Sequence, residues 1–223
     1  MNLMGRVAVL GGTGDLGFGL SLRLAKAGLE VVVGSRSIDR ALAAAERIRG
    51  VLGGGSVSGA VNKEAVRGCR FVFFTIPYEA IDEIAADVAD NLEEGCVVVS
   101  CIVAPRDAPA PTAEKLAKHL PPSAKLVTAL HTVSASLISD PSTPLNTDTF
   151  LFSDSMDAKK EVAKLLLKID GLRPVDGGPL KNSVIGEQLT WLLIGVNKRY
   201  GVGHAGIKVT GLPDEAVMNR WIS

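Results

Sequence analysis

The sequence predicts an α/β fold in which helices cover both faces of a doubly wound, mainly parallel sheet. Two observations carry this prediction. Short apolar runs alternate with helical patterns along most of the 223 residues, with short connections between them, and this order specifies parallel βαβ units. In addition, the first apolar run ends in a glycine-rich turn that leads directly into a helix, which is how a Rossmann-type nucleotide-binding unit begins.

The glycine-rich turn follows an apolar run over residues 7–10 and precedes a helical pattern that begins at Leu16. Gly12, Gly14 and Gly17 have the spacing G-x-G-x-x-G, which allows a tight turn, close approach of a pyrophosphate and close packing of helix on strand. The free N–H groups at the start of the helix favour an anion. Because strand, turn and helix occur in this order, we expect a bound dinucleotide rather than a merely flexible glycine turn.

The end of the second strand, expected over residues 31–33, indicates which dinucleotide binds. An NAD-specific fold usually has an acidic residue here to hold the ribose 2′-hydroxyl. In its place the chain has Ser35, which supplies a hydroxyl, and Arg36, whose planar guanidinium suits a phosphate. Arg40 adds a second cation one turn into the next helix. We therefore predict NADP, with a solvated basic helix start as the alternative.

The rest of the chain continues the alternation. Helices are expected over residues 41–48, 78–88, 112–120, 159–169 and 182–200. Strands are expected near residue 57 and over residues 71–77, 96–101, 125–130, 150–152 and 172–176, and loops over residues 50–59 and 104–111. The run at 71–77 is apolar throughout, which is typical of a central strand covered on both faces.

Ligands of such sheets lie at the carboxyl ends of the strands. After the first two strands, those ends are the segments 76–78, 102–103 and 131–133. They contain no convincing nucleophile with its base, and the histidines lack metal-ligand spacing, so we expect neither acyl transfer nor a metal site. An apolar cleft beside a dinucleotide suits hydride transfer to a second ring system. His131 either contacts that ring or is a strand-end histidine whose polar atoms bond to the backbone.

Residues 179–223 form a small helical extension of a nucleotide-binding domain over residues 1–178 in this interpretation. The helix expected at 182–200 is apolar around much of its girth, so we expect it either in a homodimer interface or in the core of its own chain. The glycine-rich tail at 201–208 is expected to be a loop that approaches a flat ligand closely. The helix and this tail together are expected to complete the site of a second cofactor.

Composition limits the partners and the compartment. Lys and Arg together number 24, as do Asp and Glu, so no overall charge attracts nucleic acid or an anionic membrane. Cys69, Cys96 and Cys101 lie in or beside apolar runs without CxxC spacing, which indicates reduced, buried thiols. The N-terminus lacks a secretory pattern, and no apolar segment reaches the roughly 20 residues that span a bilayer. We expect a cytoplasmic protein.

Together these residues resemble the NADPH-dependent reductases of the deazaflavin coenzyme F420, which are archaeal and bacterial NADP oxidoreductases. The similar segments are residues 10–17, 32–36, 75–77, 129–132, 169–174 and 206–208. The match runs nearly from end to end, and the segments at 129–132 and 170–178 are more specific to this family than the glycine turn. The resemblance implies hydride transfer between NADP(H) and coenzyme F420 (8-hydroxy-5-deazaflavin).

The resemblance also implies roles for individual residues. The phosphates of NADP would be bound by residues of the glycine turn, namely Gly12, Thr13, Gly14, Asp15 and Leu16. The 2′-phosphate would be bound by Ser35, Arg36 and Arg40. The nicotinamide side would be flanked by Pro77, Tyr78, Val103 and Ala135. The deazaflavin would be contacted by His131, Val133, Ala205 and Gly206, of which His131 and Val133 would position the reacting rings without forming an acid–base pair.

The chain departs from the family pattern on the deazaflavin side. Tyr78 stands where the family tends to have Trp, Val133 where Ile is usual and Ser134 where Pro is usual. Two alternatives to the deazaflavin therefore stay open. One is NADPH-dependent reduction of a small imine or carbonyl compound. The other is a non-catalytic NADP sensor that signals through its dimer helix.

Overall fold

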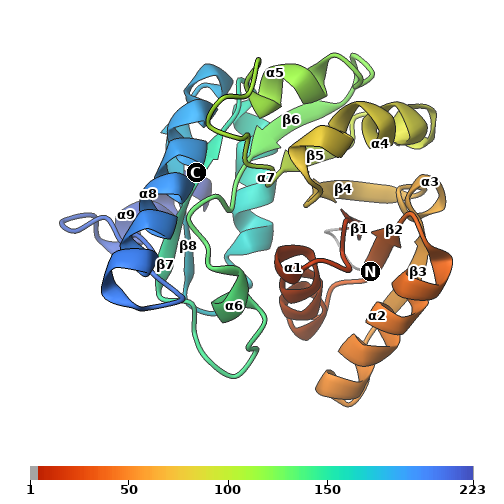
Figure 1. Cartoon of the computed structure of the whole chain (residues 1–223), viewed down its shortest axis with the longest axis horizontal. Helices are drawn as coiled ribbons and strands as arrows, with labels where there is room; N and C mark the ends of the chain where they lie inside the picture. Colours follow the sequence, from red (N-terminus) through yellow and green to blue (C-terminus); the bar gives the residue numbers. More distant parts are fainter. Residues whose placement is uncertain (1–4, 223) are drawn as a thin grey trace.

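A single eight-stranded sheet organises residues 5–222, the part of the chain that the computed structural model describes (Figure 1). Its order is β3-β2-β1-β4-β5-β6-β7-β8, and every neighbouring pair is parallel except β6 and β7. The strands are β1 (Arg6–Leu10), β2 (Val31–Ser35), β3 (Val57–Val61), β4 (Cys69–Phe74), β5 (Val97–Ser100), β6 (Lys125–Thr128), β7 (Thr147–Phe152) and β8 (Leu172–Gly178). The predicted doubly wound, mainly parallel architecture is confirmed.

Helices cover both faces of this sheet. The α-helices are α1 (Asp15–Lys26), α2 (Ile38–Leu52), α3 (Asn62–Ala65), α4 (Ile81–Val88), α5 (Thr112–Ala117), α6 (Ala135–Ile138), α7 (Met156–Leu166), α8 (Ser183–Tyr200) and α9 (Asp214–Ile222). Single 3₁₀ turns occur at Tyr78–Ala80, Ala89–Asn91 and Leu180–Asn182. Buried side chains of α1, α2, α7 and α9 form one core cluster, and those of α3, α4 and α5 form the other.

The alternation of side chains along the central strands separates the two cores. In β4, Phe71 and Phe73 belong to the cluster under α1 and α2, whereas Val72 and Phe74 belong to the cluster under α4. All four are at most 2% exposed. A strand covered on both faces is apolar at every position. The apolar run predicted as a central strand therefore contains the central strand β4, which ends at Phe74.

The neighbours of β1 place the ligand crevice. Strand β1 lies between β2 and β4, so the chain leaves β1 toward one side of the sheet and later continues on the other side. Ligands of open α/β sheets bind at such a switch point, outside the carboxyl ends of the strands. The glycine turn, the end of β2 and the segment after β4 therefore meet at one edge.

Several elements differ from the expected ones in their bounds, and some were not expected at all. The glycine-rich loop at 50–59 is shorter, because α2 continues to Leu52 and β3 begins at Val57. The short helices α3 and α6 carry too few turns to produce a helical period. Helix α9 was not expected either, yet its Trp221 is fully buried and donates from Nε1 to the Pro174 carbonyl oxygen at 2.7 Å. The end of the chain is thereby packed on β8.

Candidate functional site

The turn after β1 has the backbone geometry that a pyrophosphate needs. Gly11 has a φ of +75°, which glycine adopts without strain. A Cβ at Gly12 would lie 2.8 Å from the Val9 carbonyl oxygen, and one at Gly17 would lie 2.5 Å from the Gly11 carbonyl oxygen. At Gly14 the nearest such atom is 3.4 Å away. Gly12 and Gly17 therefore permit close packing, whereas Gly14 leaves the outer surface of the turn open.

A cavity of about 500 Å³ extends from this turn to the end of β2 and is called the first cavity below. Ser35 is buried, and its Oγ accepts a hydrogen bond from the Ser37 N–H at 3.2 Å. Arg36 and Arg40 are exposed at its rim. Its lining residues are Gly11, Thr13, Gly14, Ser35, Arg36, Ser37, Arg40, Asn62, Thr75, Ile76, Pro77, Ala80 and Ile84. The turn and the basic strand end thus share one cavity.

Asn62 is a polar residue of the first cavity that the sequence did not reveal. It is 4% exposed, and its Oδ1 has no hydrogen-bond partner among the described residues. It begins α3 directly after β3, so it lies at the carboxyl end of a strand like the predicted residues. The glycine-rich surroundings of β3 hide where this strand ends, and no other signal singles out Asn62.

A second cavity, of about 340 Å³, lies beside the start of α1 and is mostly apolar. It is assembled from segments far apart in the sequence. Its lining residues are Leu16, Cys101, Val103, Leu130, His131, Thr132, Val133, Ser134, Ala135, Ser136, Thr190, Leu193, Ile194, Asn197, Gly203 and Ala205. The structure therefore brings together the residues that the resemblance assigns around the reacting rings, with Tyr78, Pro77 and Gly206 as exceptions.

His131 lines the second cavity and also bonds to the backbone, so its geometry is compatible with both interpretations of its role. Its Nε2 lies 3.1 Å from the Ile102 carbonyl oxygen, so the neutral ring donates from Nε2. A Cβ at Gly186 of α8 would lie 2.9 Å from Nδ1, which has no partner among the described residues. Burial lowers the pKa of His131 to about 4. The ring is therefore neutral at pH 7.

The turn that presents His131 is strained. Leu130 has a φ of +68°, a conformation that non-glycine residues rarely adopt. Its N–H donates to Thr149 Oγ1 at 2.7 Å, and its carbonyl oxygen accepts from the Val133 N–H at 3.1 Å. Strand β6 consequently ends at Thr128 rather than at residue 130, and the chain turns so that His131 and Val133 reach the same cavity.

One face of α8 closes the second cavity. Thr190, Leu193, Ile194 and Asn197 have the spacing i, i+3, i+4, i+7 that places residues on one side of a helix. Thr190 Oγ1 donates to the His131 carbonyl oxygen at 2.6 Å. These residues were not predicted as site residues, because α8 is apolar on several sides and its sequence does not show which side faces the ligand.

Two further residues of α8, Glu187 and Trp191, bond to the proline-rich loop. Glu187 Oε2 accepts a hydrogen bond from the Ala104 N–H at 2.8 Å, and Trp191 Nε1 donates to the Ala104 carbonyl oxygen at 3.0 Å. Thr112 Oγ1 donates to the second carboxylate oxygen of Glu187 at 2.5 Å. Glu187 is 5% exposed, and burial raises its pKa. Helix α8 thereby fixes the chain next to Val103, which lines the second cavity.

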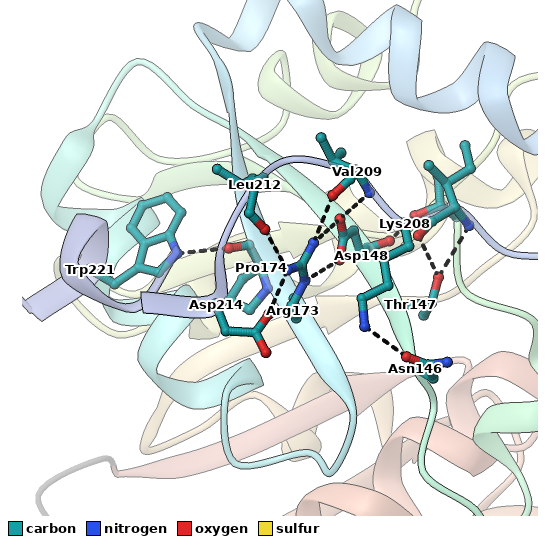
Figure 2. A network of polar contacts seen from close by, with 12 residues as sticks. Asn146, Thr147, Asp148, Arg173, Pro174, Lys208, Val209, Leu212, Asp214 and Trp221 are labelled. Atoms are coloured by element: carbon teal, nitrogen blue, oxygen red, sulfur yellow. Dashed lines mark hydrogen bonds and ion pairs between the residues drawn. The ribbon is translucent and has the colours of Figure 1, made fainter. Parts of the chain in front are cut away.

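A buried ion pair anchors the C-terminal tail beside the second cavity (Figure 2). Arg173 donates to both carboxylate oxygens of Asp148, from Nε at 2.6 Å and from Nη2 at 2.8 Å. Asp148 also accepts from the Val209 N–H at 2.7 Å, and its own N–H donates to the Ile207 carbonyl oxygen at 2.7 Å. Asp148 is fully buried. The tail is thus held on β7 immediately after Ala205.

Tyr78 and Gly206 contact other parts of the fold. The Tyr78 ring is buried, its hydroxyl donates to the Ala110 carbonyl oxygen at 2.8 Å, and Lys115 Nζ lies 4.4 Å from the ring centroid. A Cβ at Gly206 would lie 2.7 Å from Thr147 Oγ1. Tyr78 therefore supports the proline-rich loop, and the missing side chain of Gly206 lets the tail approach β7.

Within residues 5–222, no group of three or more His, Cys, Asp or Glu side chains is arranged to hold a metal ion. None of the helices in that range is both long and apolar enough to cross a membrane. The three cysteines are buried and unpaired.

Known proteins resemble this chain in sequence over most of its length. It is 34% identical to the F420-dependent NADP reductase of Methanothermobacter thermautotrophicus, over 94% of this chain and 97% of the relative. It is 32% identical to the F420-dependent NADP reductase of Methanocaldococcus jannaschii, over 93% of this chain and 99% of that protein.

A solved structure and a family model extend these similarities. A crystal structure from Arthrobacter sp. FB24, provisionally described as an F420-dependent NADP-reductase, has a TM-score of 0.77 and 26% identity, covering 92% of this chain and 98% of its own. A pyrroline-5-carboxylate reductase from Coxiella burnetii shares the fold, with a TM-score of 0.55 and 15% identity over 96% of this chain and 74% of its own. Residues 6–104 match the family model described as NADP oxidoreductase coenzyme F420-dependent. The chain therefore belongs to the family of coenzyme F420-dependent NADP oxidoreductases.

Proposed function

We propose that this protein transfers a hydride between NADP(H) and the deazaflavin coenzyme F420. The observation that carries the proposal is the pairing of two cavities at one sheet edge, one with a phosphate turn and a basic strand end, the other apolar. Hydride transfer between two ring systems needs orientation and exclusion of water rather than a protein acid or base. The neutral, buried state of His131 is consistent with that requirement.

The first cavity is proposed to bind NADP. The turn residues Gly12 to Leu16 would hold the pyrophosphate at the N-terminus of α1, where unpaired N–H groups favour an anion. Ser35, Arg36 and Arg40 would bind the 2′-phosphate, since the side chains of Arg36 and Arg40 have no other hydrogen bond or ion pair within residues 5–222. The orphaned Oδ1 of Asn62 supplies a further acceptor in the same cavity.

The second cavity is proposed to bind the deazaflavin against the nicotinamide. Pro77, which lines the first cavity, and Val103 and Ala135, which line the second, would flank the nicotinamide side, and His131, Val133 and Ala205 the deazaflavin side. Tyr78 and Gly206 line neither cavity and would act through the proline-rich loop and the tail that they support. The two bound rings would themselves supply the chemistry, a hydride transfer between nicotinamide C4 and deazaflavin C5. The protein groups would position the rings, and residues 179–223 would complete this half of the site as an extension of the domain at 1–178.

Mixing the protein with NADPH and oxidised F420 tests the proposal, because reduction removes the visible absorption band of the deazaflavin. Bleaching with turnover is expected. If NADPH binds and no bleaching occurs, the proposal fails. Reduction of a cyclic imine by NADPH would then identify a reductase of small substrates, and binding without any turnover would identify an NADP sensor.

We also propose that the protein is a cytoplasmic homodimer joined through α8. Ile185 and Leu192 lie two turns apart on this helix and are 52% and 55% exposed. Covering such an exposed apolar face with a second copy of the chain removes it from water and is therefore favourable. The buried free cysteines suit a reducing compartment. Sedimentation of the purified protein as a dimer is expected, with monomers for Leu192→Glu, and a monomeric wild-type protein would contradict the interface.

A further inference from the structure

A third cavity, of about 620 Å³, is lined by the glycine turn, α1, α2 and the segment at α6, and is called the α1 groove. In Figure 1, α1 lies between α2 and α6. The α1 groove shares Thr13, Gly14 and Arg40 with the first cavity. It shares Ala135 and Ser136 with the second cavity. The α1 groove therefore adjoins both cavities, and it meets the second cavity at Ala135 and Ser136.

Helix α2 gives the α1 groove a regular basic wall. Arg40, Ala43, Ala44 and Arg47 line it at the spacing i, i+3, i+4, i+7, so they share one side of the helix. Seven residues of helix rise about 10 Å, which separates the two guanidinium groups by two turns. The small alanines between them leave room for a ligand. The wall thus offers two cations spaced along a trough.

The Arg47 guanidinium stacks on an aromatic ring, and its N–H donors have no acceptor within residues 5–222. Its guanidinium carbon lies 4.4 Å from the ring centroid of Phe18, which forms the floor of the groove. No hydrogen bond or ion pair involves its side chain within residues 5–222. By contrast, Arg49 on the same helix bonds to Glu46 and to the Val57 carbonyl oxygen. A stacked guanidinium keeps its planar row of donors free for a carboxylate or phosphate.

The lining of the α1 groove carries a net charge of +1, which favours an anion. Its lining contains the two arginines and one acid, Asp15, which lies in the first turn of α1. NADP accounts for Arg40, because this residue also lines the first cavity. Arg47 lies two turns farther from the 2′-phosphate region and lines only the groove, so NADP does not account for it.

We propose that the α1 groove binds the anionic chain of coenzyme F420, with Arg47 as its recognition residue. This inference rests on the proposed function. Beyond its ring, the coenzyme carries a phosphate-linked chain that ends in glutamate carboxylates. With the ring in the second cavity, that chain extends over Ala135 and Ser136 and its acidic groups reach Arg47. The groove thereby selects the complete coenzyme over a deazaflavin that lacks the acidic chain.

Steady-state kinetics with two acceptors tests this assignment. One acceptor is complete F420, and the other is the deazaflavin riboside that lacks phosphate and glutamates. For Arg47→Ala we expect the KM for F420 to rise about five- to tenfold at low salt and by less at high salt, because exposed charges are screened. The KM for NADPH, the KM for the riboside and kcat should stay near wild type. Arg47→Lys should recover part of the loss.

Arg49→Ala is the matched control, because it removes a cation from the same helix outside the groove and should leave the KM for F420 unchanged. An unchanged KM for F420 in Arg47→Ala, or an equal rise for F420 and the riboside, overturns the assignment. If wild type reduces neither acceptor, the proposed function fails. Direct titration of F420 fluorescence then tests the assignment of the groove separately. Weaker binding of F420 by Arg47→Ala than by wild type supports the assignment, and unchanged binding overturns it.

Discussion

Replacing Asp148 with asparagine tests whether its buried ion pair with Arg173 holds the C-terminal tail on the sheet. The Asp148 side chain accepts two hydrogen bonds from Arg173 and one from the Val209 N–H. Asparagine preserves the shape but removes the negative charge. Its amide NH₂ group also replaces one carboxylate oxygen, so an N–H donor then faces an N–H donor of Arg173 or Val209. Arg173 then keeps its contacts with Asp214 and with the Leu212 carbonyl oxygen.

The expected loss follows from burial. Removing one partner of a buried ion pair costs about 3–5 kcal/mol, because the remaining charge stays desolvated. Asp148 is fully buried and the Arg173 side chain is 13% exposed. Since Arg173 keeps two other contacts, we expect the lower end of this range, about 3 kcal/mol. That is a large fraction of the roughly 5–15 kcal/mol by which domains are usually stable.

Urea unfolding at pH 7 measures this loss. Asp214→Asn is the matched control, because it removes a carboxylate from the same guanidinium at a position that is 76% exposed. Exposed pairs contribute at most about 1 kcal/mol. Small and equal losses in the two variants would refute the reasoning. We also expect Asp148→Asn to weaken binding of F420 more than binding of NADPH, because the tail lines only the second cavity.

Three further variants test NADP binding in the first cavity and the buried titratable groups at and beside the second. Arg36→Ala should lower NADP affinity by about 1.5–3 kcal/mol through lost charge-assisted hydrogen bonds and leave NAD affinity nearly unchanged; fluorescence titration with equal losses for both would exclude contact with the 2′-phosphate. Because the pKa of His131 is lowered from 6.5 to about 4, the unfolded chain takes up the proton first as the pH falls. Wild type should therefore lose about 2 kcal/mol of stability between pH 7.5 and 5 that His131→Gln does not lose, as urea unfolding can measure. Burial raises the pKa of Glu187, so its contribution to stability declines as the pH rises above the unfolded pKa. Glu187→Gln should remove that decline in urea melts, whereas a steeper decline would contradict it.

The half of the site around the first cavity could be predicted because its signals are local. The glycine turn follows β1 directly, and Ser35 and Arg36 end β2, so a reader of the sequence needs only the strand ends and the rule for where parallel sheets bind ligands. Asn62 obeys the same rule. It was missed because β3 (VSGAV) is weakly apolar and follows a glycine-rich loop, so the apolar pattern does not show where the strand ends.

The second cavity was less predictable because its walls come from segments that are far apart in the sequence and meet only in the fold. The sequence indicates that α8 is apolar, but not that Thr190 and Asn197 face His131 and the tail. The contact of Asp148 with Arg173 joins two strands whose parallel pairing appears only in the fold. Here the resemblance to a family supplied residues such as Val133 and Ala205 that periodicity alone does not distinguish.

This difference in construction affects how the two binding functions depend on the rest of the molecule. The turn at Gly12 to Gly17 packs against β1, β2 and Thr75 at the end of β4, all in the N-terminal part of the chain, so it should tolerate changes in the C-terminal region. The second cavity depends on two distant attachments, Glu187 to the loop at Ala104 and Asp148 to the tail at Val209. Loosening either attachment moves a wall of that cavity without touching the first. Substitutions at these attachments should therefore change binding in the second cavity more than binding in the first.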